Sequence, residues 1–231
     1  MNELAEKRSR RCNDDEALSA RREEILDVAT QLFAEHGFSE TVTQELADRL
    51  QIGKGTIYRH FPSKCELFLA AADRVMVKLN ERVDEALVGV DEPLDRPLRA
   101  IAAYLRFFAE NPHFAEMLIQ ERAHFKDRKR STYFVHRERT IERWRVLYGE
   151  MIATGRFRPM AVSQITDVVS STIYGAMFIN HFVGPTKSPD DQAREIIDVV
   201  FRGVLSEHER VNHDQRVTCA VERDPRGGKQ P

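Results

Sequence analysis

Cysteine is scarce in this chain of 231 residues: Cys12, Cys65 and Cys219 are far apart and form no CxxC pair. An odd, scattered set of cysteines argues against a disulfide framework or a zinc module. It favours a reducing, cytoplasmic setting. We therefore expect no metal ion and no cofactor.

Long apolar runs are also missing. The longest uncharged stretch, at about residues 168–183, is interrupted by serine, threonine, asparagine and histidine, so a membrane span is not expected. The charged residues 1–13 have no apolar segment behind them, so no secretory signal is visible. With 42% hydrophobic and 31% charged residues, the composition is that of a globular protein with one large domain or two modest ones.

The chain has no overall excess of positive charge, since its formal net charge is -2. Strongly basic chains are the easily recognised nucleic-acid binders, but a global balance can hide a local patch. Between residues 46 and 65 a single acid, Asp48, faces four cations, Arg49, Lys54, Arg59 and Lys64. This segment therefore has a local charge of +3, opposite in sign to the whole chain.

Alternating apolar and polar residues, the pattern of a half-buried strand, do not occur over a useful length. Apolar residues instead recur every three or four positions, as on one face of a helix. Asn111-Pro112 and Ser188-Pro189 each pair a capping side chain with proline at the first helical position. The sequence predicts an all-α fold, with one helix ending at Gly37 and others at about 43–50, 54–60, 63–88, 98–109, 112–124, 132–153, 162–183 and 189–206.

The predicted helices 43–50 and 54–60 are very short and only a few residues apart. Helices of this length are unstable alone, because nucleation is costly, so they must pack on each other and on a third helix. Their inward faces and the turn between them are marked by Leu46, small Ala47, Leu50, Ile52, Ile57 and Phe61. The spacing predicts a helix-turn-helix at about residues 42–61.

The outward residues of this segment suit DNA. Cations, hydroxyls and a glycine-exposed backbone match phosphate oxygens and base edges in a major groove, and the start of the first helix adds further donors. A charged helix is also the ordinary solvated face of a bundle, but the inward apolar set and the clustered cations together favour DNA binding. The DNA-contacting residues predicted from these properties are Thr41, Thr43, Gln44, Lys54, Gly55, Thr56, Tyr58, Arg59 and His60.

Residues from about 21 to 75 resemble the N-terminal DNA-binding domain of the TetR family of bacterial transcriptional regulators. The run Gly53–Lys64 (GKGTIYRHFPSK), with Phe33 and Gly37-Phe38 upstream, carries the resemblance. It implies an all-α homodimer, in which a three-helix DNA-binding domain is followed by a larger helical ligand-binding and dimerisation domain. It also implies that residues 54–60 form the recognition helix and that Lys64 contacts a phosphate.

Three positions depart from the family pattern. Gln51 stands where glycine is usual, and a left-handed residue other than glycine costs about 1–2 kcal/mol there. Gly53 replaces a common serine, so its N-cap hydroxyl is missing. Val42 replaces a common serine or threonine cap, which leaves Thr41 or Thr43 to cap the first short helix.

The two long C-terminal helices are apolar over more than one stripe, which requires two burial surfaces. One surface is the core of the chain itself, and the other is a symmetry mate in a four-helix dimer interface. The residues predicted for this interface are Val169, Ile173, Met177, Ile197, Phe201 and Val204.

Aromatic residues of the second domain are candidates for an apolar effector pocket with a few polar groups. An aromatic stripe at helical spacing is more often plain core, and a histidine late in an apolar helix is more often a core or interface residue, so both interpretations stay open. The candidate pocket residues are Tyr104, Phe108, Met117, Trp144, Tyr148, Tyr174, Phe178 and His181. A basic excess between residues 121 and 145 is interpreted as a loop and a solvated helix face, with a role in holding an anionic effector as the alternative.

Catalytic motifs find little support. Gly53-Lys54 resembles part of a phosphate-binding loop, but that loop needs glycine where Asp48 stands and serine or threonine where Gly55 stands. No GxSxG motif occurs, so an enzyme is not expected. A helical dimer without a DNA role, such as an adaptor, stays open as an alternative.

We expect flexible tails at residues 1–15 and 208–231, which lack apolar periodicity. Between them, residues 16–72 form the DNA-binding domain and residues 73–207 the effector-binding and dimerisation domain. The predicted function is that of a transcriptional regulator on a palindromic DNA operator, most simply a repressor released by a small molecule. The effector, the operator and the choice between repression and activation stay open.

Overall fold

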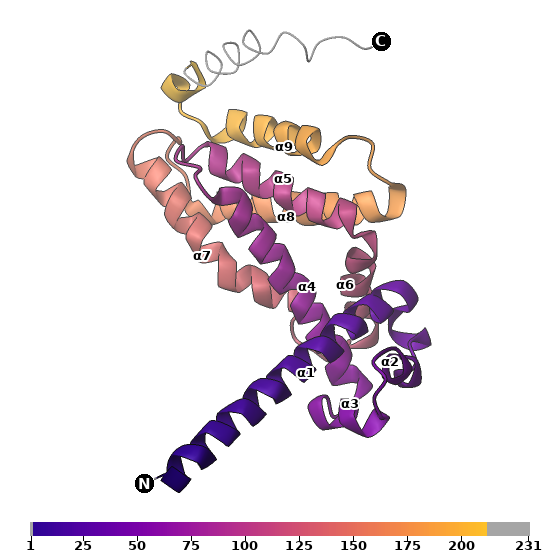
Figure 1. Ribbon diagram of the computed structural model, residues 1–231. Helices are drawn as coiled ribbons and strands as arrows, with labels where there is room; N and C mark the ends of the chain where they lie inside the picture. Colours follow the sequence, from indigo (N-terminus) through magenta and orange to yellow (C-terminus); the bar gives the residue numbers. More distant parts are fainter. Residues whose placement is uncertain (1, 212–231) are drawn as a thin grey trace, which may run out of the picture. The chain divides into compact units, whose positions relative to one another are not determined.

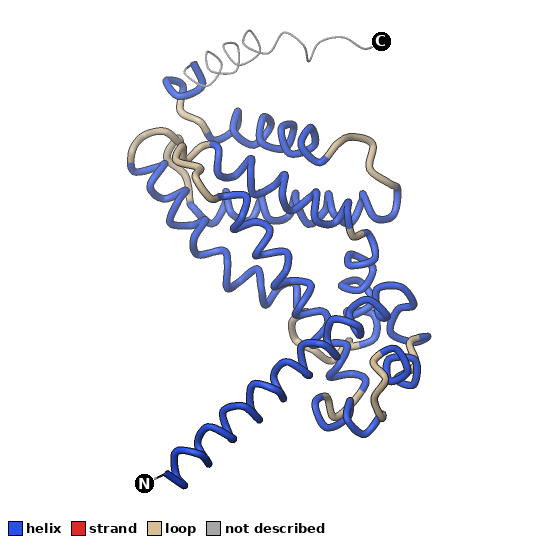
Figure 2. The backbone as a smooth tube through the Cα atoms, viewed as in Figure 1, coloured by secondary structure: helices blue, strands red, loops and turns tan. Residues whose placement is uncertain are grey.

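The computed structural model describes residues 2–211, with side chains from Ala17 onward. Helices make up most of this range, and its nearest approach to a sheet is one antiparallel bridge between Phe157 and Leu205 (Figures 1 and 2). The predicted all-α fold is therefore confirmed. None of the described helices combines the length and the hydropathy that are needed to cross a bilayer.

The helices agree closely with the predicted ranges. In chain order they are α1 (Asn2–Glu40), α2 (Thr43–Arg49), α3 (Lys54–His60), α4 (Lys64–Leu87), α5 (Asp95–Glu110), α6 (Pro112–His124), α7 (Thr132–Ala153), α8 (Val162–Val183) and α9 (Pro189–Val204). The ranges of α3, α6, α7 and α8 coincide with the prediction. The remaining differences lie at helix ends, as at α5, which begins at Asp95 rather than at residue 98.

Helix boundaries follow from local chemistry at most of the predicted positions. Gly37 has φ 74° and interrupts the regular helix of α1, as a left-handed glycine does at a helix end. The backbone N–H of Glu66 donates to the Ser63 hydroxyl at 3.1 Å before α4, and Asp191 donates to Ser188 at 3.1 Å before α9. The predicted cap at Asn111 is wrong, since its side chain makes no cap hydrogen bond at the start of α6.

The chain divides into two compact units. Among the described residues, the first comprises 2–82 with 110–136, and the second comprises 83–109 with 137–211. The first unit thus joins α1, α2, α3 and most of α4 to α6 and the start of α7. The predicted boundary at residue 72 does not include residues 110–136 in the first unit. The functional division into 16–72 and 73–207 stays a prediction.

The first unit has an aromatic centre that connects three helices. The Phe68 ring of α4 lies 5.0 Å from the Phe33 ring and 5.1 Å from the Phe38 ring, between ring centroids. Phe125, directly after α6, lies 5.3 Å from Phe38. Since Phe33 and Phe68 are fully buried, this centre fixes how α1, α4 and the end of α6 pack.

The second unit buries one broad face of α5 and the inner faces of α8 and α9. A row of rings connects α7 to α9: Tyr148 lies 5.9 Å from Phe157, which lies 5.5 Å from Phe201. Phe157 also forms the bridge with Leu205, next to which the Arg158 N–H donates to the Val204 carbonyl at 2.8 Å. The core of this unit therefore includes α5 and connects α7 to α9.

Both predicted tails differ in part from the structure. Helix α1 begins at Asn2, so residues 2–15 have helical backbone although they lack apolar periodicity; their flexibility stays a prediction. Residues 208–211 are helical, and buried Glu209 accepts a hydrogen bond from Arg156 at 2.9 Å. The second tail therefore cannot start at residue 208, because an ion pair holds Glu209. Residues 212–231 lie outside the described residues.

Candidate nucleic-acid interface

Helices α2 and α3 form the predicted helix-turn-helix in the first unit (Figure 1). The turn is closed by backbone hydrogen bonds from Ile52 to the Ala47 carbonyl at 3.0 Å and from Gln51 to the Asp48 carbonyl at 3.2 Å. Gln51 has φ 54°, so the left-handed conformation expected at this position is confirmed. The turn thus keeps its geometry although glycine is missing.

The inward face of the motif is the predicted one. Leu46, Ala47, Ile57 and Phe61 are buried, with Ile57 at 0% exposure, and Leu50 is half-buried. Small Ala47 lets the two short helices approach each other. The burial of Ile57 fixes the rotation of α3 and so decides which of its side chains reach solvent.

The outward face of α3 carries the predicted donors. Lys54, Gly55, Tyr58 and Arg59 are exposed, and Thr56 is half-buried. No other atom lies within 4 Å of a Cβ built on Gly55, so the backbone here is open to an approaching ligand. The exposed face therefore offers ammonium, guanidinium and phenol groups around a bare backbone.

The start of α2 contributes two further polar groups, half-buried Thr43 and exposed Gln44. The hydroxyls of Thr43 and Tyr58 share a hydrogen bond of 3.0 Å, and the Gln44 amide donates to Asp48 at 2.7 Å. Arg49 donates to Glu45 at 2.8 Å, and this hydrogen bond raises the pKa of its guanidinium. The carboxylate of Glu45 thereby balances the positive charge of Arg49. The cations that remain available to a ligand are those of α3 and of the start of α4.

Thr41 is not an outward donor, so its predicted phosphate contact is wrong. Its side chain is 4% exposed, and its hydroxyl donates to the Gly37 carbonyl at 2.6 Å. The reason is that the broken end of α1 leaves carbonyls that need donors. The N-cap of α2 is Val42, so neither Thr41 nor Thr43 caps this helix.

His60 also differs from the prediction of an outward contact. The residue is half-buried, and its Nε2 atom is buried without a hydrogen-bond partner in the described part of the chain. Burial and the positive charge of Arg59 lower the pKa of His60 below the ordinary 6.5. The imidazole is therefore a neutral group at the edge of the core rather than a phosphate-binding cation.

Lys64 lies at the first turn of α4 and is held by the segment between α1 and α2. Its ammonium donates to the Ser39 carbonyl at 3.0 Å and lies 4.8 Å from the centroid of the Phe38 ring. An ammonium has three donors, so two remain for a phosphate. This geometry is compatible with the phosphate contact that the resemblance implies.

The predicted effector residues are divided between the two units. Met117 belongs to the first unit, whereas the other seven belong to the second. Tyr104 is buried and donates to the Met177 sulfur at 3.5 Å, and Tyr148 is buried with its pKa raised by burial. Phe178 is exposed. For Tyr104, Phe108 and Tyr148 the alternative of a plain core residue fits the burial, and the effector pocket stays a prediction.

Five of the six predicted dimer residues lie on a face that is buried in the chain itself, and the assignment of Ile173 stays a prediction. Val169, Met177, Ile197, Phe201 and Val204 are buried within their own chain, and Ile173 is half-buried. Side chains buried in this way cannot also cover a second copy. Five of the exposed apolar residues of α8 and α9 are here named the apolar strip: Val168, Ile179, Phe182, Val183 and Val199.

The sequence contained a signal for the apolar strip. At 3.6 residues per turn, residues 168, 179 and 182 of α8 lie within about 60° of one another around the helix. Residues 169, 173 and 177 lie about 100–180° away from residue 168. Both faces are apolar, so the periodicity indicated two burial surfaces without telling which one belongs to the core.

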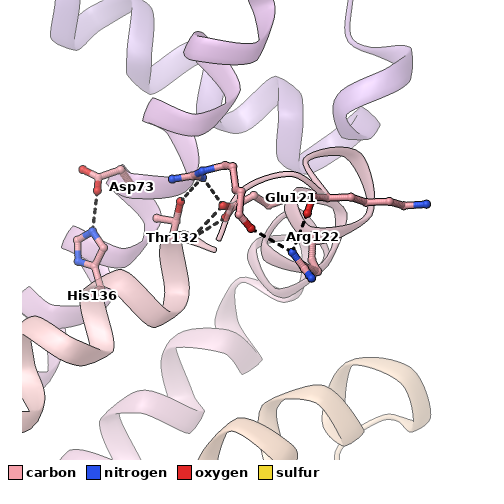
Figure 3. Close-up of polar contacts among 7 residues, drawn as sticks. Asp73, Glu121, Arg122, Thr132 and His136 are labelled. Atoms are coloured by element: carbon pink, nitrogen blue, oxygen red, sulfur yellow. Dashed lines mark hydrogen bonds and ion pairs between the residues drawn. The ribbon is translucent and has the colours of Figure 1, made fainter. Parts of the chain in front are cut away.

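The basic stretch 121–145 contains a buried acid that sequence reasoning missed (Figure 3). Glu121 is 1% exposed; its carboxylate accepts the Thr132 N–H at 2.9 Å and pairs with Arg128. Arg122 donates to the carbonyls of Lys126 and Arg128, both at 3.3 Å. Two of the cations, Arg122 and Arg128, thus hold the loop between α6 and α7 through these contacts, in addition to the loop and solvated helix face that the sequence indicated.

Together these features define a class: a helix-turn-helix domain with an exposed basic face, joined in one chain to a second helical unit. Residues 25–71 match the family model described as bacterial regulatory proteins, tetR family. This range contains both α2 and α3. The chain is classified in the tetR family, as its resemblance to that family implies.

Individual relatives match over parts of the chain. The HTH-type transcriptional repressor KstR of Mycobacterium tuberculosis is 29% identical over 103 residues, which are 45% of this chain and 47% of KstR. The HTH-type transcriptional activator FasR of Mycolicibacterium smegmatis is 33% identical over 87 residues, 38% of this chain and 40% of FasR. The chain spans about half the length of the curated relatives it matches.

Among solved structures, similarity extends over more of the helical architecture. The TetR family transcriptional regulator PfmR from Thermus thermophilus has a TM-score of 0.60 and 26% sequence identity. The match covers 77% of this chain and 97% of PfmR. The fold similarity therefore reaches well beyond the helix-turn-helix.

Proposed function

We propose that the chain is a sequence-specific DNA-binding transcriptional regulator. It binds a near-palindromic operator as a homodimer and acts as a repressor that a small molecule releases. The observation that carries the proposal is the two-sided character of α3. Ile57 is fully buried on one side, while Lys54, Tyr58 and Arg59 are exposed on the other.

This face suits recognition of duplex DNA. The ammonium of Lys54 and the guanidinium of Arg59 bind phosphates or the acceptor edge of guanine. Gly55 lets the DNA backbone or a base edge approach α3 without a side chain in the way. Neutralised phosphates release counterions, so operator affinity falls as salt rises.

A homodimer follows from the apolar strip and from the geometry of operators. The five side chains of the apolar strip are exposed on two helices that contact each other, and exposed apolar surface of this kind marks a protein–protein interface. In a twofold dimer the two recognition helices lie about one turn of DNA apart and read a palindrome. The proposed partner at the apolar strip is a second copy of this chain.

The regulatory part rests on the second unit. A small molecule changes operator binding only if it has different affinities for the DNA-binding state and another state of the dimer. KstR is named a repressor and FasR an activator, so similarity to such proteins accommodates both directions of control. We choose repression, place the protein in the cytoplasm with the DNA, and assign it no catalytic step.

The proposal is tested by selecting binding sites from a library of random duplexes. The wild-type protein is expected to enrich one palindromic sequence, and fluorescence anisotropy then gives its Kd. Lys54→Ala and Tyr58→Ala are expected to raise this Kd at least tenfold while the circular dichroism spectrum is unchanged. Arg139→Ala, an exposed cation of α7, is the matched control and leaves the Kd unchanged.

Two outcomes contradict the proposal. If no sequence is enriched, or if both α3 variants bind the selected duplex as tightly as the wild type, α3 does not read DNA. The second outcome favours the adaptor class. Candidate effectors are then scored by whether they release the protein from its operator, and strengthened binding would overturn the repressor assignment alone.

A further inference from the structure

The segment Gly37–Thr41 comprises the end of α1 from its interruption at Gly37 onward and the next residue, and polar contacts hold its backbone at several points. The Phe38 N–H donates to the side-chain oxygen of Gln120 on α6 at 2.8 Å. The Gly37 carbonyl accepts the Thr41 hydroxyl at 2.6 Å, and the Ser39 carbonyl accepts the Lys64 ammonium at 3.0 Å. Because α2 begins two residues after Thr41, the position of this segment sets the position of the helix-turn-helix.

Gln120 fits the segment closely. A Cβ built on Gly37 would lie 2.6 Å from the side-chain oxygen of Gln120 and 2.7 Å from its nitrogen, so the amide occupies space that only glycine leaves. The φ of 74° at Gly37 independently favours glycine. Gly37 therefore allows Gln120 to pack against the segment in two ways: it has no side chain in the space of the amide, and it adopts the left-handed backbone.

A second hydrogen bond fixes the orientation of the Gln120 amide. Its nitrogen donates to the Glu116 carboxylate, one turn earlier on α6, at 3.0 Å. With the nitrogen held by an acceptor, the amide oxygen faces the Phe38 N–H. Glu116 thus orients Gln120, and Gln120 holds the backbone of the segment.

The Phe38 ring is held by the same helices as its backbone. Its centroid lies 5.1 Å from that of Phe68 on α4 and 5.0 Å from that of His124 on α6. On α4 the Lys64 ammonium lies 4.8 Å from the Phe38 centroid. A displacement of the segment therefore also displaces Lys64, the residue at the start of α4 for which the family resemblance implies a phosphate contact.

We propose that Gln120 is a positioning residue for DNA recognition: through the Phe38 backbone it fixes the helix-turn-helix and Lys64 in the geometry that binds the operator. This inference rests on the proposed function and deepens it. Gln120 touches no DNA, so its effect falls on the precision of recognition. Contacts that read bases require one exact placement, whereas attraction to phosphates tolerates a displaced helix.

The test uses the full-length protein and the duplex selected by the wild type. Gln120→Leu keeps the side-chain size but leaves the Phe38 N–H without its acceptor. It is expected to raise the Kd for the selected duplex about fivefold, with little change for a random-sequence duplex of equal length. Hydrogen exchange at the Phe38 amide is expected to accelerate in the free protein, which reports the lost hydrogen bond without any DNA.

Exchanging the two partners on α6 provides the rescue. The double variant Glu116→Gln with Gln120→Glu keeps the total charge, returns an acceptor to the Phe38 N–H, and returns a donor beside it. Gln120→Glu alone places two carboxylates one turn apart on α6. Their repulsion is expected to weaken binding to the selected duplex. The double variant is expected to regain most of the wild-type affinity and the slow exchange at Phe38.

The outcomes separate the inference from the function that it rests on. If the wild type selects a duplex and Gln120→Leu binds it equally well, or loses affinity for both duplexes alike, the positioning role is overturned while the proposed function stands. A folded double variant that fails to regain affinity also overturns it. If the wild type selects no duplex, the proposed function fails and this inference fails with it.

Discussion

The hydroxyls of Thr43 and Tyr58 share a hydrogen bond of 3.0 Å, which joins the first residue of α2 to the exposed face of α3. Tyr58 is 41% exposed, so the bond lies at the surface proposed to meet DNA. Each hydroxyl has one donor and two acceptor sites, so each can orient the other and still bind a phosphate. Two residues that the sequence predicted as separate contacts are therefore one coupled pair.

Removing only the Tyr58 hydroxyl tests this coupling. Tyr58→Phe is expected to raise the Kd for the selected duplex about threefold to tenfold, as the loss of one or two neutral hydrogen bonds does. Thr43→Val removes the other hydroxyl. Fluorescence anisotropy on both single variants and the double variant gives the coupling, and strictly additive effects would show that the two hydroxyls act independently.

Replacing Gln51 by glycine is expected to stabilise the protein. Gln51 has φ 54°, which costs a residue with a Cβ about 1–2 kcal/mol and costs glycine little. The gain is partly offset because glycine gives the unfolded chain more freedom, so we expect a net gain of about 0.5–1 kcal/mol. Thermal unfolding followed by circular dichroism measures the difference.

Gly155→Ala is the matched reverse change for the Gln51 prediction. Gly155 has φ 74°, and a Cβ built there meets no other atom within 4 Å, so only backbone strain is added. The melting temperature of the Gly155→Ala variant is expected to lie below that of the wild type, and the melting temperature of Gln51→Gly above it. A lower melting temperature for Gln51→Gly would mean that the Gln51 side chain makes a contact worth more than the strain.

His60 is expected to make the stability of the protein depend on pH. Burial, Arg59, Arg22 and Arg21 lower its pKa in the folded state below the ordinary 6.5. Between the lowered pKa and 6.5 the unfolded chain binds more protons, so stability rises with pH there. The free energy of unfolding is therefore expected to decrease as the pH falls below about 6.5.

His60→Gln removes the titrating group and is expected to flatten that part of the profile. Urea unfolding of both proteins between pH 5 and 8, a range chosen to bracket the ordinary pKa of about 6.5, measures the difference. His36, an exposed histidine on α1, provides the control through His36→Gln. Equal pH slopes for wild type and His60→Gln would contradict the assignment to His60.

The apolar strip predicts the variant that separates the two copies. Ile179 is 58% exposed on α8, and Ile179→Glu is expected to disrupt the dimer without unfolding the chain. Sedimentation equilibrium measures the change, and operator affinity is expected to fall with it, because each half-site is then bound separately. Val88→Glu, at an 82% exposed position outside α8 and α9, is the control. A dimer unaffected by Ile179→Glu would move the interface elsewhere.

The sequence predicts the helices and the inward face of the helix-turn-helix well, because both depend on local periodicity. Ile57 and Phe61 are four residues apart, one helical turn, with polar residues between them. Few rotations of so short a helix bury both side chains. Even the left-handed backbone at Gln51 follows from the family pattern of the turn. These features are decided by neighbours in sequence.

The errors share a physical cause, which is that tertiary packing decides between local alternatives. Thr41 can donate to a ligand or to the carbonyl of Gly37, and the interruption of α1 selects the carbonyl. Val169 and Val168 are adjacent on α8 and both apolar, and only the packing of the second unit makes Val169 the buried one. No periodicity distinguishes these pairs.

Glu121 gives a prediction about stability that leaves DNA recognition aside. Its carboxylate is buried, pairs with Arg128 and accepts the Thr132 N–H at 2.9 Å, so it fixes the loop between α6 and α7. Glu121→Gln keeps an acceptor but removes the charge that Arg128 meets. Because Arg128 is 36% exposed and partly screened, we expect a loss of about 1–2 kcal/mol in urea unfolding.

Glu121→Ala removes both interactions and leaves a cavity, so its loss is expected to exceed that of Glu121→Gln by about 1–2 kcal/mol. Glu142→Gln breaks only the exposed pair with Arg145 at 3.2 Å, and its effect is expected to stay within about 0.5 kcal/mol. The order of the three variants is the decisive measurement. If Glu121→Gln proves as harmless as Glu142→Gln, the buried carboxylate is stabilised by its hydrogen bond alone, and Arg128 belongs to the solvated face that its sequence context suggests.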